Sequence, residues 1–288
     1  MDIKEYRLKV QQKIEQFEIE EKWDQDVEDD PVSTVLMPND VDYLNKKLSS
    51  KIKTRFANHM AQTFFEKLIK KNQFIIKEVK GIENFLAVRD RGVIITSNHF
   101  SPGENYAVWR AIRKQMREDK RLLYRVIKEG NYTNPPKPFG LFMRHCNTLP
   151  LSSNMDTMKN FMKALSTLLL RGEKILIYPE QAMWWNYKKP RPLKPGAFRF
   201  AVKNKAPVLP FFITMEDSKY KDENGEPVQA YTVHILKPLF VDEKLSDKEN
   251  IENMKNKNYE MWKEVYENTY KIPLTYKTKK ESEWCYFI

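Results

Sequence analysis

The sequence is poor in glycine, cysteine and long apolar runs, and each shortage narrows the class of protein. Of 288 residues, only eight are glycine and two are cysteine. Cys146 and Cys285 form no metal or redox spacing, so we expect free thiols and a cytosolic protein. No uninterrupted apolar stretch approaches the ~20 residues that span a bilayer. The first residues, MDIKEYRLKVQQK, lack the apolar segment of a signal peptide.

The charge is unevenly distributed along the chain. Residues 1–30 hold eleven acidic and five basic side chains, a net charge of −6, whereas the whole chain has a formal charge of +11. The remaining residues therefore carry +17, and such a basic body suits a nucleic acid, an anionic membrane or a phosphorylated substrate such as coenzyme A. No glycine-rich clamp, zinc spacing or recognition signature for nucleic acid accompanies this charge, so we expect no nucleic-acid partner. The four histidines are scattered, and no metal is implied.

Short apolar runs alternate with helical patterns through the middle of the chain. This alternation predicts an α/β fold with a mixed, largely parallel central sheet flanked by helices, behind an N-terminal helical region. We expect three parts: a helical region over 1–80 with an acidic leader, an α/β domain over 81–245, and a C-terminal helix and tail over 246–288 that pack on the domain. The expected strands are Val93–Thr96, Leu122–Ile127, Ile175–Tyr178, Val208–Ile213 and Tyr231–Leu236, and the expected helices cover 103–119, 156–171 and 247–270.

Ahead of the first expected strand, apolar residues recur at helical spacing. They include Phe56, Met60, Phe64 and Leu68. One interpretation packs this helix on the core. The other lays it in the membrane interface, with its basic side toward lipid headgroups. The two interpretations are compatible if different turns of the helix serve each.

The stretch TSNHFSPGENYAVW, which begins at Thr96, joins an expected strand to an expected helix. Six of the eight glycines lie between positions 92 and 196, so tight turns are concentrated in the same third of the chain. One interpretation is a capping box, with Ser101 as N-cap, Pro102 as first helical residue and Glu104 bonded back to the serine. This interpretation explains Glu104 without catalysis. It leaves His99 unexplained.

A chemical interpretation assigns a role to both residues. His99 lies at a strand-to-helix junction, where open α/β sheets usually bind their ligands. As a general base, His99 would take the proton from an acceptor hydroxyl, so that the oxygen attacks a thioester carbonyl. The positive end of the following helix favours the neutral ring that a base requires. Glu104 would fix the tautomer of the ring, as the acid of a catalytic triad does.

Asn98-His99 followed by Glu104 resembles the H-x4-D motif of the glycerolipid acyltransferases, of the 1-acylglycerol-3-phosphate O-acyltransferase type. A second block, KEGNYTNPPKPFGLFMRHCNTLPL (128–151), matches the family at Lys128, Glu129, Pro138, Phe139 and Gly140, but Leu151-Ser152-Ser153 replace its closing acid and arginine. A third block, ILIYPEQAMWW (175–185), matches at Tyr178, Pro179 and Glu180, but Gln181, Ala182 and Met183 stand in place of Gly-Thr-Arg. LKPGAFRFA (193–201) is similar to the following Phe-Lys-x-Gly segment, and APVLPFFI (206–213) to the Val-x-Pro block with Pro210. The resemblance covers about 90–215.

The resemblance implies an enzyme that moves a fatty acyl group from acyl-CoA or acyl carrier protein to a lyso-glycerolipid hydroxyl, such as that of lysophosphatidate, in phospholipid synthesis or remodelling. It implies no cofactor beyond the thioester co-substrate, and a peripheral location on the cytoplasmic face of a membrane. Two alternatives stay open: a non-phosphatidate acceptor such as a glycolipid, and a non-catalytic lipid-binding homologue. The site residues that it implies are His99 and Glu104 for catalysis, and Asn98, Lys128, Glu180, Lys194 and Gly196 for substrate binding.

The missing arginine of the third block is followed by a basic run. Residues 188–205 include seven lysines and arginines and no acid. This run is either a solvated surface or a rim that binds coenzyme A phosphates, an anionic headgroup or the membrane. Trp184, Trp185 and Tyr187, just before the run, line an acyl or headgroup slot or belong to a core.

Overall fold

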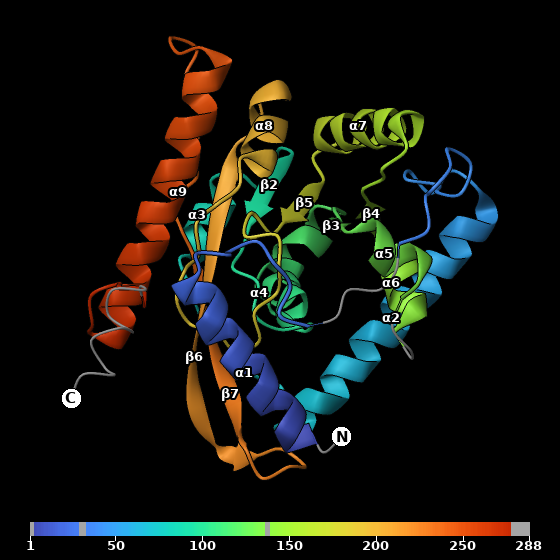
Figure 1. Cartoon of the computed structure of the whole chain (residues 1–288). Helices are drawn as coiled ribbons and strands as arrows, with labels where there is room; N and C mark the ends of the chain where they lie inside the picture. The colour runs from blue at the N-terminus through green and yellow to red at the C-terminus, as the bar shows by residue number, and fades with distance from the viewer. Residues whose placement is uncertain (1–2, 29–32, 136–138, 278–288) are drawn as a thin grey trace.

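A seven-stranded sheet forms the centre of the computed structural model, which describes residues 3–28, 33–135 and 139–277 (Figure 1). The strand order is β1-β7-β6-β2-β5-β3-β4. Only β6 and β7 run antiparallel, and every other neighbouring pair is parallel, so the expected mixed, largely parallel α/β fold is confirmed. Pro138 and Cys285 lie outside the described residues. The strands are β1 Ile75–Lys80, β2 Val93–Thr96, β3 Leu123–Ile127, β4 Thr148–Pro150, β5 Lys174–Ile177, β6 Val208–Lys221 and β7 Pro227–Ile235.

All five strands expected from apolar runs are present, and two strands lie outside that expectation. β1, IIKEVK, is an edge strand whose last four residues are exposed, so it has no apolar run to reveal it. β4, at the other edge, has three residues and is shorter than any reliable periodicity. β6 continues beyond the expected Ile213 to Lys221, and its last six residues are largely exposed. The centre of the sheet was therefore predictable, and its two edge strands were not.

Helices cover both faces of the sheet, because successive strand residues point to opposite sides. Ile94 packs on the side of α7, α8 and α9. Val93 and Ile95 pack on the other side, with α3 and α4. The longer helices are α1 Ile3–Ile19, α2 Leu48–Lys70, α4 Glu104–Glu118, α7 Met155–Leu170, α8 Gly196–Lys203 and α9 Asp247–Tyr270, and the short ones are α3 Ile82–Leu86, α5 Glu129–Thr133 and α6 Gly140–His145.

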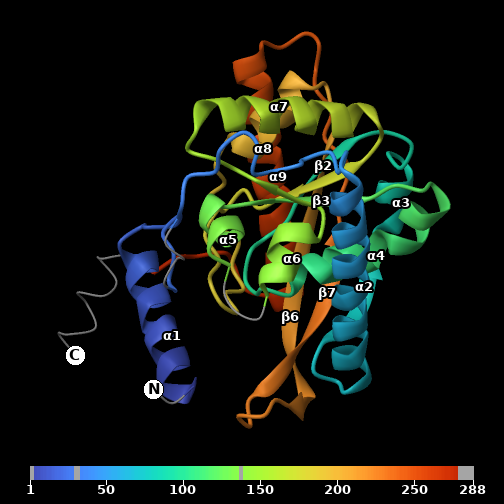
Figure 2. The same cartoon turned by 90° about the vertical axis from the view of Figure 1, so that its right-hand side faces the viewer.

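The apolar pattern of α2 divides into two lines along the helix. Phe65, Leu68 and Ile69 pack against the core on the α4 side of the sheet. A second line faces outward, with exposures between 39% and 73%. Figures 1 and 2 show α2 at one side of the molecule, beside α6. The core and surface interpretations of the pattern therefore each fit part of it, and the outward residues, here named the apolar line of α2, are Leu48, Ile52, Phe56, Met60 and Phe64.

The acidic leader, residues 3–28, lies over the loop that follows β5. Its helix α1 contributes Val10, Ile14 and Phe17 to a separate apolar cluster with Ala182 and Trp184. In the described part of the chain, no helix is both long enough and apolar enough to cross a bilayer.

Candidate active site

His99 and Tyr178 meet at one edge of the sheet because they follow neighbouring parallel strands. Thr96, the last residue of β2, pairs with Ile177, the last residue of β5. Carboxyl ends of parallel strands share one edge, so the segments that leave them lie side by side. The two rings are stacked, with centroids 4.0 Å apart and planes inclined by 11°. Tyr178 therefore fixes one face of the imidazole.

The His99 ring is held in one tautomer by Glu104. Glu104 Oε1 lies 2.6 Å from His99 Nδ1, and the glutamate side chain is only 1% exposed. A carboxylate accepts hydrogen bonds, so Nδ1 carries the proton and Nε2 keeps its lone pair. The His99 side chain is 22% exposed, and no described residue hydrogen-bonds Nε2. This nitrogen is thus free to take a proton from a substrate.

Glu104 also serves the turn before α4. Its second oxygen, Oε2, accepts the backbone N–H of Ser101 at 2.6 Å, and the Gly103 N–H donates to Ser101 Oγ at 3.2 Å. The expected N-cap is wrong by two residues, because α4 begins at Glu104 with Gly103 as its N-cap. The capping and catalytic interpretations of Glu104 are nevertheless compatible, because each uses a different carboxylate oxygen.

Tyr178 connects this pair with a buried arginine. The Tyr178 hydroxyl is buried beside the carboxylate of Glu104. Burial, together with the negative charge of Glu104, raises the pKa of Tyr178 well above its usual value. Arg125 lowers that pKa in turn, and its Nε donates to Asn105 Oδ1 at 3.0 Å, next to Glu104 in the chain. The hydroxyl of Tyr178 therefore stays protonated, and its ring lies beside His99 as a neutral group.

Glu180 is expected to bind substrate, and in the structure it is engaged with the protein itself. Its Oε2 accepts the backbone N–H of His99 at 2.9 Å and Arg191 Nη2 at 3.0 Å, while Oε1 accepts the Arg191 backbone N–H at 2.8 Å. Glu180 is 2% exposed and Arg191 is 1% exposed. The guanidinium also lies 4.6 Å from the ring centroid of Trp184. Glu180 thus ties the His99 backbone to a buried ion pair.

Asn98 holds the same loop from its other side. Its Nδ2 donates to the carbonyl of Ile213 at 3.0 Å, and its Oδ1 accepts the N–H of Ile213 at 2.9 Å. The residue is 2% exposed. Both ends of the amide are therefore used by β6, which fixes the position of the histidine that follows.

The two lysines expected to contact substrate are paired with the acidic leader. Lys194 Nζ lies 2.8 Å from Asp24, and Lys128 forms an ion pair with Asp26. The hydrogen bond from Lys194 is the main cause that lowers the pKa of Asp24. The uneven charge of the sequence predicted an acidic segment and a basic body, but it did not predict that the two contact each other through ion pairs.

The rest of the basic run is divided between buried, paired and exposed positions. Lys189 pairs at 2.5 Å with the buried Glu18 of α1, which also accepts the Tyr187 hydroxyl at 3.0 Å. Trp184 is fully buried under the leader. Gly196 is the first residue of α8, and an added Cβ there would meet no atom within 4 Å. The exposed members of the run are Lys188, Arg199, Lys203 and Lys205.

The acyltransferase family model matches residues 77–214, from β1 into β6. This segment of the chain, residues 77–214, belongs to the acyltransferase family. His99, Glu104, Glu180 and Lys194 all lie within the matched segment. Among solved structures, the chain is similar to the crystal structure of the 1-acyl-sn-glycerophosphate (LPA) acyltransferase PlsC from Thermotoga maritima, at 19% identity and a TM-score of 0.45, over 76% of this chain and 84% of that one. No curated protein matches the chain.

Proposed function

We propose that this acyltransferase moves a fatty acyl group from acyl-CoA or acyl carrier protein to the hydroxyl of a lyso-glycerolipid of the lysophosphatidate type. The observation that carries the proposal is the contact of 2.6 Å between His99 Nδ1 and Glu104, while no described residue hydrogen-bonds Nε2. This arrangement suits a general base whose proton comes from outside the protein.

The reaction follows from that geometry in two steps. Nε2 of His99 takes the hydroxyl proton while the oxygen forms a bond to the thioester carbonyl carbon. The carbon–sulfur bond then breaks, and the protonated Nε2 returns the proton to the departing thiolate. A positioned base of this kind contributes about 10²–10⁴ in rate. Glu104 stabilises the transient positive charge of the ring.

The remaining residues position the base or contact the substrate. Asn98 and Glu180 act as positioning residues, because their side-chain atoms bond the loop that bears His99. Lys128, Lys194 and Gly196 are proposed substrate contacts. For the lysines to take a phosphate, the anion must replace the carboxylates of Asp26 and Asp24.

One observation favours a second acceptor class. The third block has no arginine at its end, and Arg191 nearby is buried against Glu180. With both expected lysines also paired, an acceptor without a phosphate, such as a lysoglycolipid, fits the same site with fewer rearrangements. The base and the thioester donor would be unchanged.

The apolar line of α2 supports a peripheral location at the cytoplasmic face of a membrane. Its members are spaced four residues apart, which places them along one exposed side of the helix. An exposed apolar strip beside basic residues is typical of helices that lie in a membrane interface. Replacing Phe56 and Met60 with glutamine is expected to lower co-sedimentation with anionic vesicles, and unchanged binding would contradict this placement.

The test of the function is thiol release from acyl-CoA with a panel of lyso-lipids. We expect activity with at least one acceptor, and a loss of about 10²–10⁴ for His99→Ala with an unchanged melting temperature. A folded and active His99→Ala variant would exclude the mechanism. Lyso-lipid binding without thiol release by the native protein would identify a non-catalytic homologue instead.

A further inference from the structure

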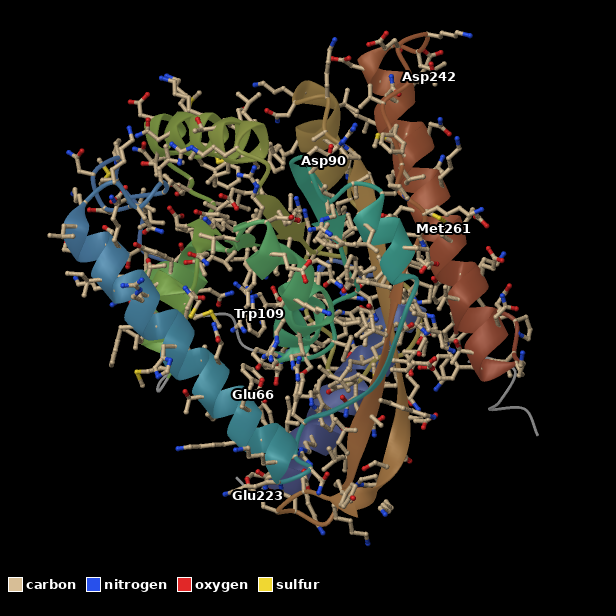
Figure 3. The ribbon with its side chains drawn as sticks, turned by 180° about the vertical axis from the view of Figure 1, so that it is seen from behind. Glu66, Asp90, Trp109, Glu223, Asp242 and Met261 are labelled. Carbon is tan, nitrogen blue, oxygen red and sulfur yellow. The ribbon has the colours of Figure 1, made fainter. Side chains whose placement is uncertain are left out.

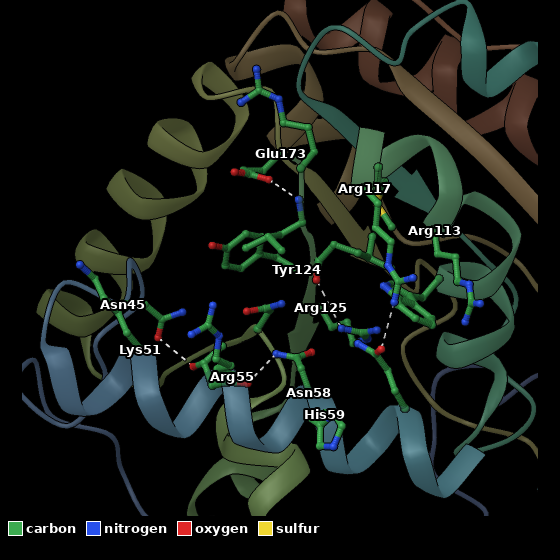
Figure 4. A pocket seen from close by; sticks show the side chains of 18 of the residues that line it. Asn45, Lys51, Arg55, Asn58, His59, Arg113, Arg117, Tyr124, Arg125 and Glu173 are labelled. Carbon is green, nitrogen blue, oxygen red and sulfur yellow. Dashed lines mark hydrogen bonds between the residues drawn. The ribbon is translucent and has the colours of Figure 1, made fainter. Parts of the chain in front are cut away.

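A cavity of about 640 Å³ lies between α2, α4 and the start of β3 (Figure 4). We name it the α2 cavity. His99 and Glu104 do not line it. Figure 3, seen from behind, shows α2 running diagonally beside α4, with Glu66 labelled on α2 and Trp109 on α4. Arg55 of α2 and Arg117 of α4 approach the space from opposite walls (Figure 4).

The walls of the α2 cavity carry a large excess of positive charge. One lining arginine, Arg113, pairs with Glu66 at 2.8 Å. The one acidic lining residue, Glu173, is buried and accepts the backbone N–H of Leu122 at 2.6 Å. No described carboxylate lies within ion-pair distance of six further cations that line the cavity: Lys51, Arg55, Arg117, Arg121, Arg125 and Arg171.

A buried amide in the wall also lacks a partner. Asn147 is 8% exposed, and its Oδ1 accepts no hydrogen bond from any residue that the structure describes. Buried polar groups in folded proteins nearly always have one. Asn147 lines both the α2 cavity and an adjoining cavity of about 210 Å³. An amide can donate to or accept from a ligand, so this side chain points to a polar occupant.

The size of the α2 cavity and its aromatic walls indicate more than a single phosphate. Sites for small molecules commonly have volumes of about 300–1,000 Å³. Trp109 has the guanidinium groups of Arg113 and Arg117 at 5.5 and 6.0 Å from its ring centroid, and Tyr124 forms another part of the wall. Flat aromatic and guanidinium surfaces stack with nucleobases. Several cations with such surfaces suit a nucleotide that carries more than one phosphate.

Arg125 connects the α2 cavity to the catalytic pair. It lines the cavity and donates to Asn105, the residue after Glu104. It also contributes to the electrostatic environment of Tyr178, whose ring is stacked on His99. The inner wall of the cavity therefore lies next to the catalytic pair, but His99 and Glu104 are not part of that wall.

We propose that the α2 cavity binds the phosphates and base of a nucleotide-type ligand. The proposed function supplies such a ligand, the coenzyme A moiety of the donor thioester, and the identification with coenzyme A rests on that function. In this arrangement the nucleotide is held between α2 and α4, at a distance from His99, and the acyl end extends toward the base. Arg55 and Arg117, on opposite walls of the cavity, supply charge-assisted bonds to the phosphate oxygens.

The experiment measures binding by calorimetry in the full chain with His99→Ala, so that no turnover occurs. The probes are coenzyme A, 3′-dephospho-coenzyme A, pantetheine and inorganic phosphate. We expect coenzyme A to bind, the loss of its 3′-phosphate to weaken binding several-fold, and Arg55→Gln with Arg117→Gln to weaken it about ten-fold or more. The matched control is Lys67→Gln with Lys70→Gln, which removes the same charge from α2 outside the cavity and should leave affinity unchanged.

Three results would overturn the assignment. Equal affinity for coenzyme A in the Arg55/Arg117 variant and the control would remove the cavity from the binding site. Equal affinity for pantetheine and coenzyme A would show that no phosphate is recognised. If the Arg55/Arg117 variant lost binding to phosphatidylglycerol vesicles but kept coenzyme A, the cavity would bind a lipid headgroup.

The cavity and the proposed function fail separately in these measurements. Cavity-dependent binding of coenzyme A to a protein with no acyl-transfer activity would support the nucleotide site and reject the enzyme. Conversely, transfer from acyl-CoA that is insensitive to Arg55→Gln with Arg117→Gln at low donor concentration would support the enzyme and reject the site.

Discussion

The loop around His99 and the α2 cavity differ in how their charges are partnered. Glu104 bonds His99, Glu180 bonds Arg191, and Lys194 bonds Asp24, so charges near the base are matched within the protein. In the α2 cavity, six of the seven lining cations have no described carboxylate within ion-pair distance, and Glu173 is the one acidic lining residue. Matched charges fix a geometry, whereas unmatched ones leave a potential for a ligand to neutralise. This difference supports the two proposals, which place the chemistry at His99 and anion binding in the α2 cavity.

The largest expected effect tests whether the loop around His99 is the catalytic region. Glu104→Gln keeps a hydrogen-bonding side chain but removes the charge that supports the protonated ring, so we expect kcat to fall by about 10² or more. Glu104→Asp retains the carboxylate at the family's usual residue type and should keep measurable activity. Equal rates for the two variants, measured by thiol release, would reduce Glu104 to a role in the turn before α4.

The second effect concerns the stability of the same region. Glu180→Gln leaves the Arg191 guanidinium buried without its counter-charge, which typically costs about 3–5 kcal/mol of unfolding free energy. Denaturant unfolding measures this loss. The variant Glu180→Gln with Arg191→Met removes both charges and should recover much of it. A single variant as stable as the native protein would show that the buried pair does not hold the His99 loop.

The third effect tests whether Lys194, which is paired with the acidic leader, binds the phosphate of the acceptor. Such a result would contradict the separation of chemistry and anion binding. Asp24→Asn releases Lys194, while exposed pairs of this kind contribute only about 0–1 kcal/mol to stability. We expect KM for lysophosphatidate to fall several-fold and KM for an uncharged lyso-lipid to stay unchanged. Glu252→Gln, which removes an acid from the exposed pair with Lys255 on α9, is the control. Unchanged KM values would favour the phosphate-free acceptor.

The sequence predicted what depends on nearby residues. His99 and Glu104 are five positions apart, across one turn at a strand-to-helix junction, so their contact could be predicted from local geometry. The five strands with buried apolar runs were found for the same reason, whereas β1 lies at an edge with most of its residues exposed and carries no apolar period.

What the sequence did not predict depends on pairing between distant segments. The ion pairs of Asp24 with Lys194 and Asp26 with Lys128 cross more than one hundred positions, and charge signs alone do not select partners. The α2 cavity collects arginines from α2, α4, β3 and the end of α7, none of which shares a motif with the others. Tyr178 was noted as part of the third block, but only the register of β2 and β5 places its ring on His99.

The smallest expected effect is a change in the pKa of a histidine near the α2 cavity, which reports the positive potential there. His145 lines the smaller cavity that adjoins the α2 cavity. Burial lowers the pKa of His145, and the positive charges of Lys53 and Arg144 lower it further. Lys53→Met should therefore raise this pKa toward its ordinary value, as should coenzyme A bound in the α2 cavity, because its phosphates offset the positive potential. Proton NMR titration of the histidine ring protons measures both shifts.

His234 in β7 is the internal control for that titration. Burial lowers the pKa of His234 to about 4, so its shift comes mainly from the sheet and neither change should move it. Since the folded pKa lies below the unfolded one, the unfolded chain takes up this proton first, and stability should fall as pH drops from about 6.5 toward 4. If neither Lys53→Met nor coenzyme A shifts the pKa of His145, as neither is expected to shift that of His234, the cations beside α2 create no positive potential that a bound anion could offset. The proposed difference between the two regions would then be wrong.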